Sequence, residues 1–243
     1  MNNLEWQARV DTAALYRLIA LEGWDDLIGT HVSARIPGDE HRFLLNPYGM
    51  LFEEITASNL LTVDLDGNQL TTSDYAFNRA GFTIHSAVHM NRDDAMFVIH
   101  LHTDYGIAVS CQEDGLKPLN QTAIAVYSDL AYHDYEGVAT NLAERERLVE
   151  DLGAKNAMIL RNHGTMACGP NAGGAWQAIF RLERACRYQI LAESGSATTR
   201  SLSVDIIDSR ASVTSTDALE TRGNFIWPAL LRKLDRIDKS YRD

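Results

Sequence analysis

The chain has 243 residues, 45% of them hydrophobic and 23% charged, which is the composition of an ordinary globular protein with one large or two small domains. The net charge of −11, from 22 Lys and Arg against 33 Asp and Glu, argues against a nucleic-acid-binding protein, which needs a basic surface. No apolar stretch approaches the roughly 18 residues of a membrane-spanning helix, so no contact with a membrane is expected.

Helices and short strands are predicted to alternate along most of the chain. Apolar residues at helical spacing predict helices over residues 4–23, 80–92, 103–115 and 171–194. Short apolar or alternating runs predict strands over residues 31–37, 42–47, 61–65 and 96–102, and within residues 156–169. A turn at residues 38–41 would join the first two strands into a hairpin. This pattern indicates an α/β protein.

No internal repeat or clear linker divides residues 1–200, so we expect one domain there. Residues 201–243 are expected to form a C-terminal extension that packs on the domain or on a neighbouring subunit. Residues 194–210 are rich in Ser and Thr and predict a loose connection. In the helix before them, the amphipathic pattern predicts that Glu183, Arg184 and Arg187 face solvent.

The cysteines and the N-terminus indicate a cytoplasmic protein. Cys111, Cys168 and Cys186 are odd in number and form no CxxC pair, so neither a disulfide framework nor a thiolate zinc site is indicated. The first residues lack the basic and apolar regions of a signal peptide.

Two histidines stand one residue apart in the apolar segment 95–106. Since side chains alternate along a strand, His100 and His102 would share one face. The best third partner is His163, which follows an apolar run and precedes Gly164, where the backbone can turn sharply. Three imidazoles with an open position suit Zn, Mn, Fe or Co. The alternative is three separate histidines, each satisfied by ordinary packing.

Five stretches, in this order, resemble the class II aldolase/adducin family: GTHVSARI, LNPYGMLFEEITASNLLTVDLDGN, AGFTIHSAVHMNRDDAMFVIHLHT, LAYHDYEG and LRNHGTMACG. The resemblance covers about residues 8–195 and is closer to the adducin-like branch than to fuculose phosphate aldolase. It implies a three-layer α/β/α sandwich around a mostly antiparallel sheet. It also implies one divalent metal, zinc before Mn, Fe or Co, held by His100, His102 and His163, and a homotetramer with sites at subunit interfaces.

One departure from the family concerns its proton-transfer base. The aldolases keep a glutamate four residues before the histidine that matches His85, whereas this chain has Gly81 there. Glycine neither takes a proton nor binds a metal, so aldol chemistry of the usual kind is not expected. His85 would either orient the site or be satisfied in the core, and His89 is expected at the surface.

The phosphate-binding loops of the family are also altered. Tyr48 and Gly49 replace a Thr-Gly pair, Arg79 replaces a serine, and His31 replaces an asparagine. Backbone N–H groups at Gly29 and Gly49, in the two glycine loops, remain candidates for binding an anion. The planar guanidinium group of Arg79 suits a carboxylate. The predicted substrate-binding residues are Gly29, Thr30, His31, Tyr48, Gly49 and Arg79. An ordinary loop or surface role is the alternative for each.

Two residues are candidates for a catalytic acid. Tyr135 falls near the tyrosine that acts as an acid in the family's aldolases. His133 competes with it, because the unperturbed pKa of histidine suits proton transfer near neutral pH.

Three classes of function remain open at this point. The first is a metal-dependent lyase, of aldolase or decarboxylase type, in which the metal is a Lewis acid that stabilises an enediolate or carbanion. Its substrate would be a small hydroxy-carbonyl or carboxylate. The second is a non-catalytic, adducin-like interaction protein, and the third is an Fe(II)-dependent oxygenase. Decarboxylation needs no base to generate the carbanion, so Gly81 harms it least.

Overall fold

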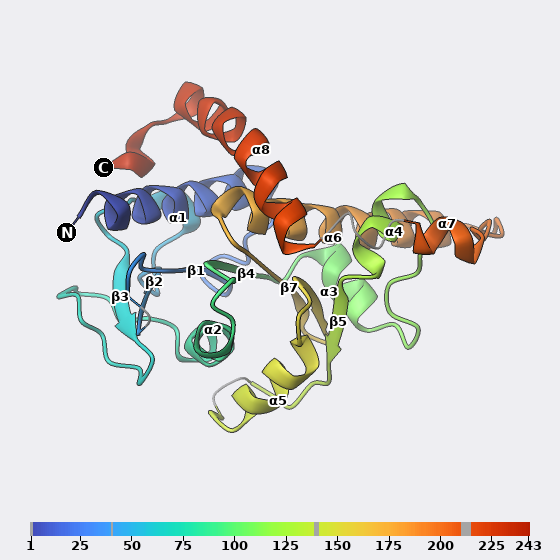
Figure 1. The fold of residues 1–243 in the computed structure, drawn as a ribbon, viewed down its shortest axis with the longest axis horizontal. Helices are drawn as coiled ribbons and strands as arrows, with labels where there is room; N and C mark the ends of the chain where they lie inside the picture. The colour runs from blue at the N-terminus through green and yellow to red at the C-terminus, as the bar shows by residue number, and fades with distance from the viewer. Residues whose placement is uncertain (1, 40, 139–140, 210–214) are drawn as a thin grey trace.

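A computed structural model describes residues 2–39, 41–138, 141–209 and 215–243. Helices cover both faces of a central sheet, giving three layers, α/β/α (Figure 1). This is the fold class that the sequence predicts. Among the described residues, none of the helices has both the length and the apolar character needed to cross a bilayer.

The sheet has seven strands in the order β3-β2-β1-β4-β7-β6-β5. Every neighbouring pair is antiparallel except β5 and β6, which are parallel, so the sheet is mixed and mostly antiparallel. The strands are β1 (His31–Arg35), β2 (Arg42–Leu45), β3 (Leu61–Asp64), β4 (Phe97–Leu101), β5 (Leu130–His133), β6 (Ala157–Leu160) and β7 (Gly164–Gly169).

The helices divide between the two faces. The longest lie together on one face (Figure 1), where they share a core with β1 and β4; they are α1 (Asn3–Glu22), α6 (Ala172–Glu193) and α8 (Thr216–Ile237), accompanied by α3 (Asp104–Ser110) and α4 (Gln121–Tyr127). The opposite face is covered by α2 (Arg79–Asn91) and α5 (Glu144–Leu152). The short α7 (Val204–Asp208) and two 3-10 turns, Phe52–Glu54 and Ser240–Arg242, complete the described elements.

Strand alternation decides which side chains of β4 meet which layer. Ile99 and Leu101 enter the core beneath α6, whereas Val98 enters the core beneath α2 and α5. His100 follows the same alternation and therefore points to the α2 side. The pairing of β4 with β1 places His31 directly opposite His100.

Two predicted segments differ from the structure. The helix expected to reach Gly115 ends at Ser110, and Gly115 instead takes a left-handed turn at φ 61°. The segment 194–210, expected to be a loose connection, contains the helix α7. Two residues of the predicted turn and connection, Glu40 and Arg210, lie outside the described residues.

The C-terminal region packs against its own chain. Helix α8 lies across α6 and α1 (Figure 1), and Tyr241 near the end of the chain is fully buried. Its hydroxyl donates a 2.8 Å hydrogen bond to Asp235. This burial places Tyr241 in the core of its own chain.

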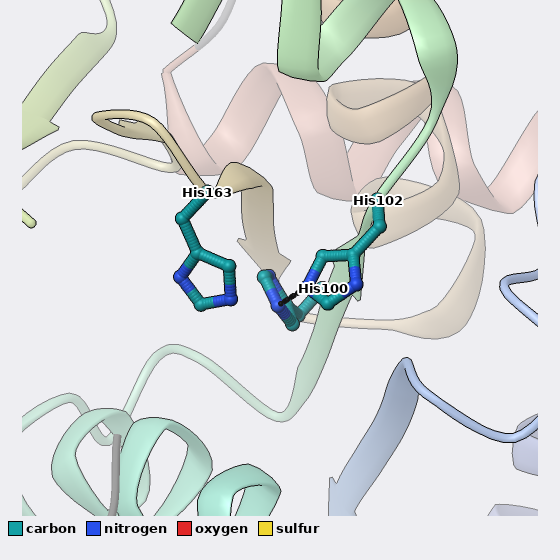
Figure 2. Close-up of side chains that lie close together, drawn as sticks. All are labelled: His100, His102 and His163. Carbon is teal, nitrogen blue, oxygen red and sulfur yellow. Dashed lines mark hydrogen bonds between the residues drawn. The ribbon is translucent and has the colours of Figure 1, made fainter. Parts of the chain in front are cut away.

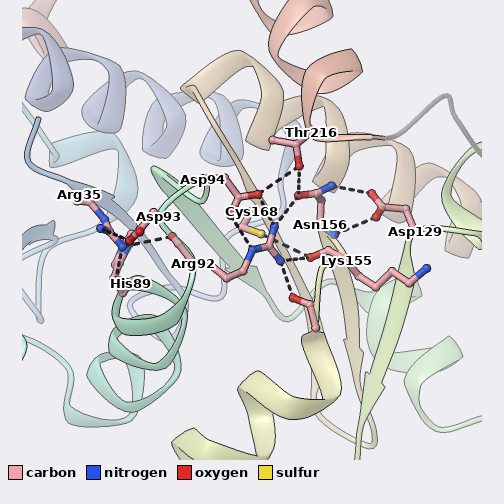
Figure 3. A network of polar contacts seen from close by, with 11 residues as sticks. Arg35, His89, Arg92, Asp93, Asp94, Asp129, Lys155, Asn156, Cys168 and Thr216 are labelled. Carbon is pink, nitrogen blue, oxygen red and sulfur yellow. Dashed lines mark hydrogen bonds and ion pairs between the residues drawn. The ribbon is translucent and has the colours of Figure 1, made fainter. Parts of the chain in front are cut away.

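Arg92, at the end of α2, joins three parts of the fold (Figure 3). Its Nη1 donates to the carbonyl oxygens of Gly153 and Lys155, both at 2.8 Å, and its Nε donates to Asp94 at 2.7 Å. Asp94 in turn accepts a 3.3 Å hydrogen bond from Thr216 at the start of α8. These bonds hold the end of α2 to the loop before β6 and to the C-terminal helix.

Candidate metal centre

Three histidines converge at one end of the sheet (Figure 2). His100 lies in β4, His102 follows β4 directly, and His163 lies in the turn between β6 and β7. Their ring centroids are 4.7–4.9 Å apart, and one nitrogen of each lies within 4.8 Å of the others. His100 is buried and the other two are partly exposed, so the cluster is open to solvent on one side. Among the described residues, only this group meets those criteria for a metal site.

Hydrogen bonds behind the first two rings determine which nitrogens face inward. The Nδ1 of His100 donates to the carbonyl oxygen of Thr165 at 3.0 Å, and the Nδ1 of His102 donates to Asp26 at 2.9 Å. In the neutral rings, Nε2 is then the lone-pair atom, and the two Nε2 atoms lie 2.9 Å apart. Two inward lone pairs, each fixed by a partner on the far nitrogen, form the arrangement that a metal ligand set requires.

Burial keeps two of these rings neutral. It lowers the pKa of His163 to about 4, with His102 and His133 adding to the effect. It also lowers the pKa of His100 far below the ordinary value, with His163 and His31 as the next contributors. Neutral imidazole is the form that binds a metal. The donor set of three imidazoles therefore fits a divalent ion such as zinc.

The backbone around His163 is shaped by two residues. Asn162 takes the left-handed conformation with φ 56°. A β-carbon at Gly164 would lie 2.3 Å from the carbonyl oxygen of Leu101, so only glycine allows β7 to approach β4 here. The sharp turn expected at Gly164 is thus made by Asn162, while Gly164 provides the close approach.

Glu183 lies under the site and not on the solvent side of α6, where the helical pattern places it. Its side chain is buried at 3% exposure and accepts hydrogen bonds from the hydroxyls of Thr103 and Thr165. Thr103 follows His102, and the carbonyl of Thr165 holds His100. Burial raises the pKa of Glu183 to about 7, against the effect of those two bonds. Neither its burial nor the role of Asp26 was predicted.

A buried hydrogen-bonded chain runs from His31 into the protein. The Nδ1 of His31 and the Nε2 of His85 share a 2.8 Å hydrogen bond, and the other nitrogen of His85 bonds to Ser33. The Ser33 hydroxyl also bonds to the Nε2 of His89 at 2.7 Å. His89, expected at the surface, is 2% exposed because it lies beneath β1, and burial lowers its pKa to about 3.

His31 lies between these buried hydrogen-bonded residues and the three histidines of the metal centre. Its ring centroid is 5.1 Å from that of His100 and 4.7 Å from that of His85. On its third side it meets the backbone of α2, where a β-carbon at Gly81 would be 2.5 Å from the ring. The structure therefore brings His31 to the site and places it in the space that any side chain at position 81 would need.

The loops that contain Gly29 and Gly49, both expected to bind substrate, lie in different surroundings. The N–H of Gly29 donates to the carbonyl oxygen of Asp26 at 2.7 Å, so the anion-binding group expected there is used within its own loop. Thr30 is buried, and its hydroxyl has no hydrogen-bond partner among the described residues. Gly49 has φ 113°, and Tyr48 beside it is exposed. For Gly29, Thr30, Tyr48 and Gly49, substrate contact stays a prediction.

Arg79 lies at the start of α2, but its side chain points to the β3 side. Its guanidinium lies over Phe77, 5.0 Å from the ring centroid. A β-carbon at Gly67, in the turn after β3, would lie 3.5 Å from its Nη1. To reach a carboxylate at the histidines, the exposed side chain would have to leave Phe77.

The two acid candidates occupy different surroundings. Tyr135 is 53% exposed, with its ring centroid 6.1 Å from that of His163. His133 is buried, and its Nδ1 donates to Asp151 at 2.7 Å while Glu144 lies 3.6 Å from its Nε2. The structure thus places Tyr135 on the open side of the histidine cluster and His133 behind it. Their catalytic roles stay predictions.

The family model described as the class II aldolase and adducin N-terminal domain matches residues 10–190 of this chain. A protein of Caulobacter vibrioides, named provisionally as an aldolase class 2 protein, is 53% identical over 243 residues, covering 100% of this chain and 95% of its own. Mouse alpha-adducin is 40% identical over 192 residues, which span 77% of this chain and 26% of that protein.

Two solved structures have folds similar to that of this chain. An aldolase II superfamily protein from Pseudomonas syringae superposes with a TM-score of 0.93 at 46% identity, covering 100% of this chain and 98% of its own. An L-fuculose 1-phosphate aldolase from Glaciozyma antarctica superposes with a TM-score of 0.85 at 26% identity, covering 98% and 93%. Both similarities span nearly the whole chain, including α8.

Proposed function

Because the chain belongs to the class II aldolase and adducin family, we propose that it is a metal-dependent lyase that cleaves a C–C bond beside a carbonyl group. Its substrate would be a small hydroxy-carbonyl or carboxylate. The observation that carries the proposal is the convergence of three imidazoles, two of them fixed with Nε2 inward by Thr165 and Asp26. A catalytic ion needs an open coordination position, and the partly exposed His102 and His163 leave this cluster open to solvent on one side.

In this proposal His100, His102 and His163 hold one divalent ion, zinc before Mn, Fe or Co. When bound, the ion supplies Lewis-acid polarisation of the substrate's carbonyl oxygen. Asp26 and the carbonyl of Thr165 keep the two ligating rings in the required tautomer. Tyr135, on the open side beside His163, would move a proton through its hydroxyl, because its exposed ring can reach a substrate there.

Position 81 favours decarboxylation over aldol cleavage. No side chain at Gly81 can abstract a proton, and the ring of His31 fills the adjoining space. Loss of CO2 leaves its electron pair on carbon without the help of a base, so it suits such a site. Sugar-phosphate cleavage, the activity that the name of the Glaciozyma protein gives, would lack both the base and the usual phosphate loops.

The second candidate is a non-catalytic interaction protein. The identity of 40% to mouse alpha-adducin, together with Gly81, favours it. The two candidates make opposite predictions about turnover. A homotetramer is proposed for either, and light scattering that shows a monomer at micromolar concentration would contradict it.

The experiment is a substrate screen on metal-loaded protein, using sugar phosphates and hydroxylated aromatic or keto acids, with aldehyde and CO2 followed separately. We expect CO2 release from at least one acid, and its loss in a folded His163→Ala variant. An exposed histidine provides the matched control, because His41→Ala should leave the activity unchanged. Turnover of none of the substrates with Zn, Mn, Fe or Co would favour the interaction protein.

A further inference from the structure

Three arginines line a cavity of about 450 Å³ between α4, α6 and α8. Arg181 and Arg184 come from α6, and Arg222 comes from α8. In the part of the chain that the structure describes, no Asp or Glu lines this cavity. A cavity whose only charges are positive stands out in a chain of net charge −11, and it creates a local field that attracts anions.

Helical spacing aims the α6 side chains into the cavity. Gln177, Arg181, Arg184 and Tyr188 follow one another at intervals of four, three and four residues, so they share one face of the helix. The Nε of Arg184 donates to the hydroxyl of Tyr188 at 3.0 Å, and its guanidinium lies 5.1 Å from the centroid of that ring. Arg184 is therefore held in place before any ligand arrives.

Arg181 carries the strongest sign of a missing counter-charge. Its Nη1 is buried without a hydrogen-bond partner among the described residues, and no ion pair involves Arg181 or Arg184 there. Burial lowers the pKa of Arg181, and the nearby positive charge of Arg222 lowers it further. The positive charges of Arg181 and Arg222 lie close enough to repel each other, and an oxyanion placed between the guanidinium groups would offset this repulsion.

We propose that this cavity is a second binding site, for a small polar molecule that carries a phosphate group. Guanidinium groups bind phosphate oxygens in pairs, and three of them suit a doubly charged anion. The volume is within the range of small-molecule sites and leaves room for more than the phosphate. Gln121 and Gln177 offer hydrogen bonds to a hydroxylated body.

None of the three histidines of the proposed lyase centre lines this cavity, although Arg184 also borders a neighbouring hollow that contains His102. The cavity lies on the face of the sheet covered by α6 and α8, whereas His100 points to the α2 side. The inference goes beyond the proposed function, and it stands even for a protein without turnover.

Calorimetric titration of the whole chain with ribose 5-phosphate, inorganic phosphate and ribose tests the proposal. A chelator and the His102→Ala background remove any contribution from a metal. We expect saturable binding of ribose 5-phosphate, weaker binding of phosphate and none of ribose. Arg181→Gln should weaken binding about 10-fold or more, as expected for loss of a charged hydrogen bond. Arg187→Gln is the matched control, because it removes a charge from α6 outside the cavity.

Arg184→Gln provides a second variant if Arg181→Gln does not fold, and the same loss is expected of it. Equal affinity in Arg187→Gln and in either cavity variant would overturn the proposal, because the binding would then reflect net charge alone. Absence of saturable binding by the parent protein at millimolar ribose 5-phosphate would overturn it as well.

Discussion

The imidazole ring of His31 fills the space beside the α-carbon of Gly81, so that a β-carbon placed at residue 81 would lie 2.5 Å from its Cδ2. The ring cannot simply move away, because His85 and His100 lie against its other sides and only 3% of His31 is exposed. The two positions are therefore coupled. A histidine at position 31 requires glycine at position 81.

This coupling predicts a non-additive pair of substitutions. Gly81→Ala should lower the free energy of unfolding by about 1–3 kcal/mol, the usual cost of overpacking a core. In a His31→Ala background, Gly81→Ala should lower the free energy of unfolding much less, because the colliding ring is gone. Urea unfolding of the four proteins measures the coupling. In open space, alanine would instead stabilise the helix by about 1 kcal/mol, so a gain in Gly81→Ala alone would contradict the coupling.

Asp26 should support metal binding without contacting the ion. Asp26→Ala removes the acceptor that holds Nδ1 of His102, and the loss of such a partner typically weakens metal affinity about 10–100-fold. Competition with a coloured chelator measures the affinity. Asp25→Ala is the control, because it removes a neighbouring charge without touching the ring. Equal affinities in the two variants would show that the carboxylate of Asp26 plays no special part.

Glu183 should make stability depend on pH. Its pKa is raised from 4.5 to about 7 in the folded protein, so between these values the folded state holds a proton that the unfolded state releases. Stability then falls as pH rises through this window, by at most about 3 kcal/mol. In Glu183→Gln this contribution is absent. Urea unfolding from pH 5 to pH 8, with chelator present, should show the parent losing stability relative to the variant, whereas parallel curves would exclude the effect.

The site should favour loss of CO2 over retro-aldol cleavage. A positioned general base contributes about 10²–10⁴-fold in rate, and Gly81 provides none. We expect little or no aldehyde from fuculose phosphate or similar sugar phosphates. If Arg79 leaves Phe77 to hold a carboxylate, Arg79→Ala should abolish CO2 release while the metal stays bound. Efficient cleavage of a sugar phosphate would refute this assignment.

Local patterns in the sequence predict most of the elements and part of the site. Alternation along a strand is enough to place His100 and His102 on one face, and the apolar run before His163, the glycine after it and the family resemblance all indicate His163 as the third member. Asp26 could not be found this way, because it meets His102 across 76 positions and lies in a loop without periodicity. Contacts of this kind depend on how β4 lies against the loop after α1.

For Glu183, the sequence pattern predicts the wrong environment. Its position among the charged residues of α6 predicts exposure, yet Thr103, just before α3, and Thr165, in β7, provide buried hydrogen-bond partners. His89 was expected at the surface for a similar reason, and Ser33 of β1 provides its buried partner. A helical pattern describes spacing along one element, whereas the burial of Glu183 and of His89 depends on hydroxyl groups contributed by other elements.

The most direct test of the account is the metal content of protein purified without chelator and dialysed, compared between the parent chain, His102→Ala and His41→Ala. We predict about one divalent ion per chain in the parent and in His41→Ala, and a large loss in a folded His102→Ala protein. Sub-stoichiometric metal that is the same in all three proteins would contradict the claim that His100, His102 and His163 form a metal site.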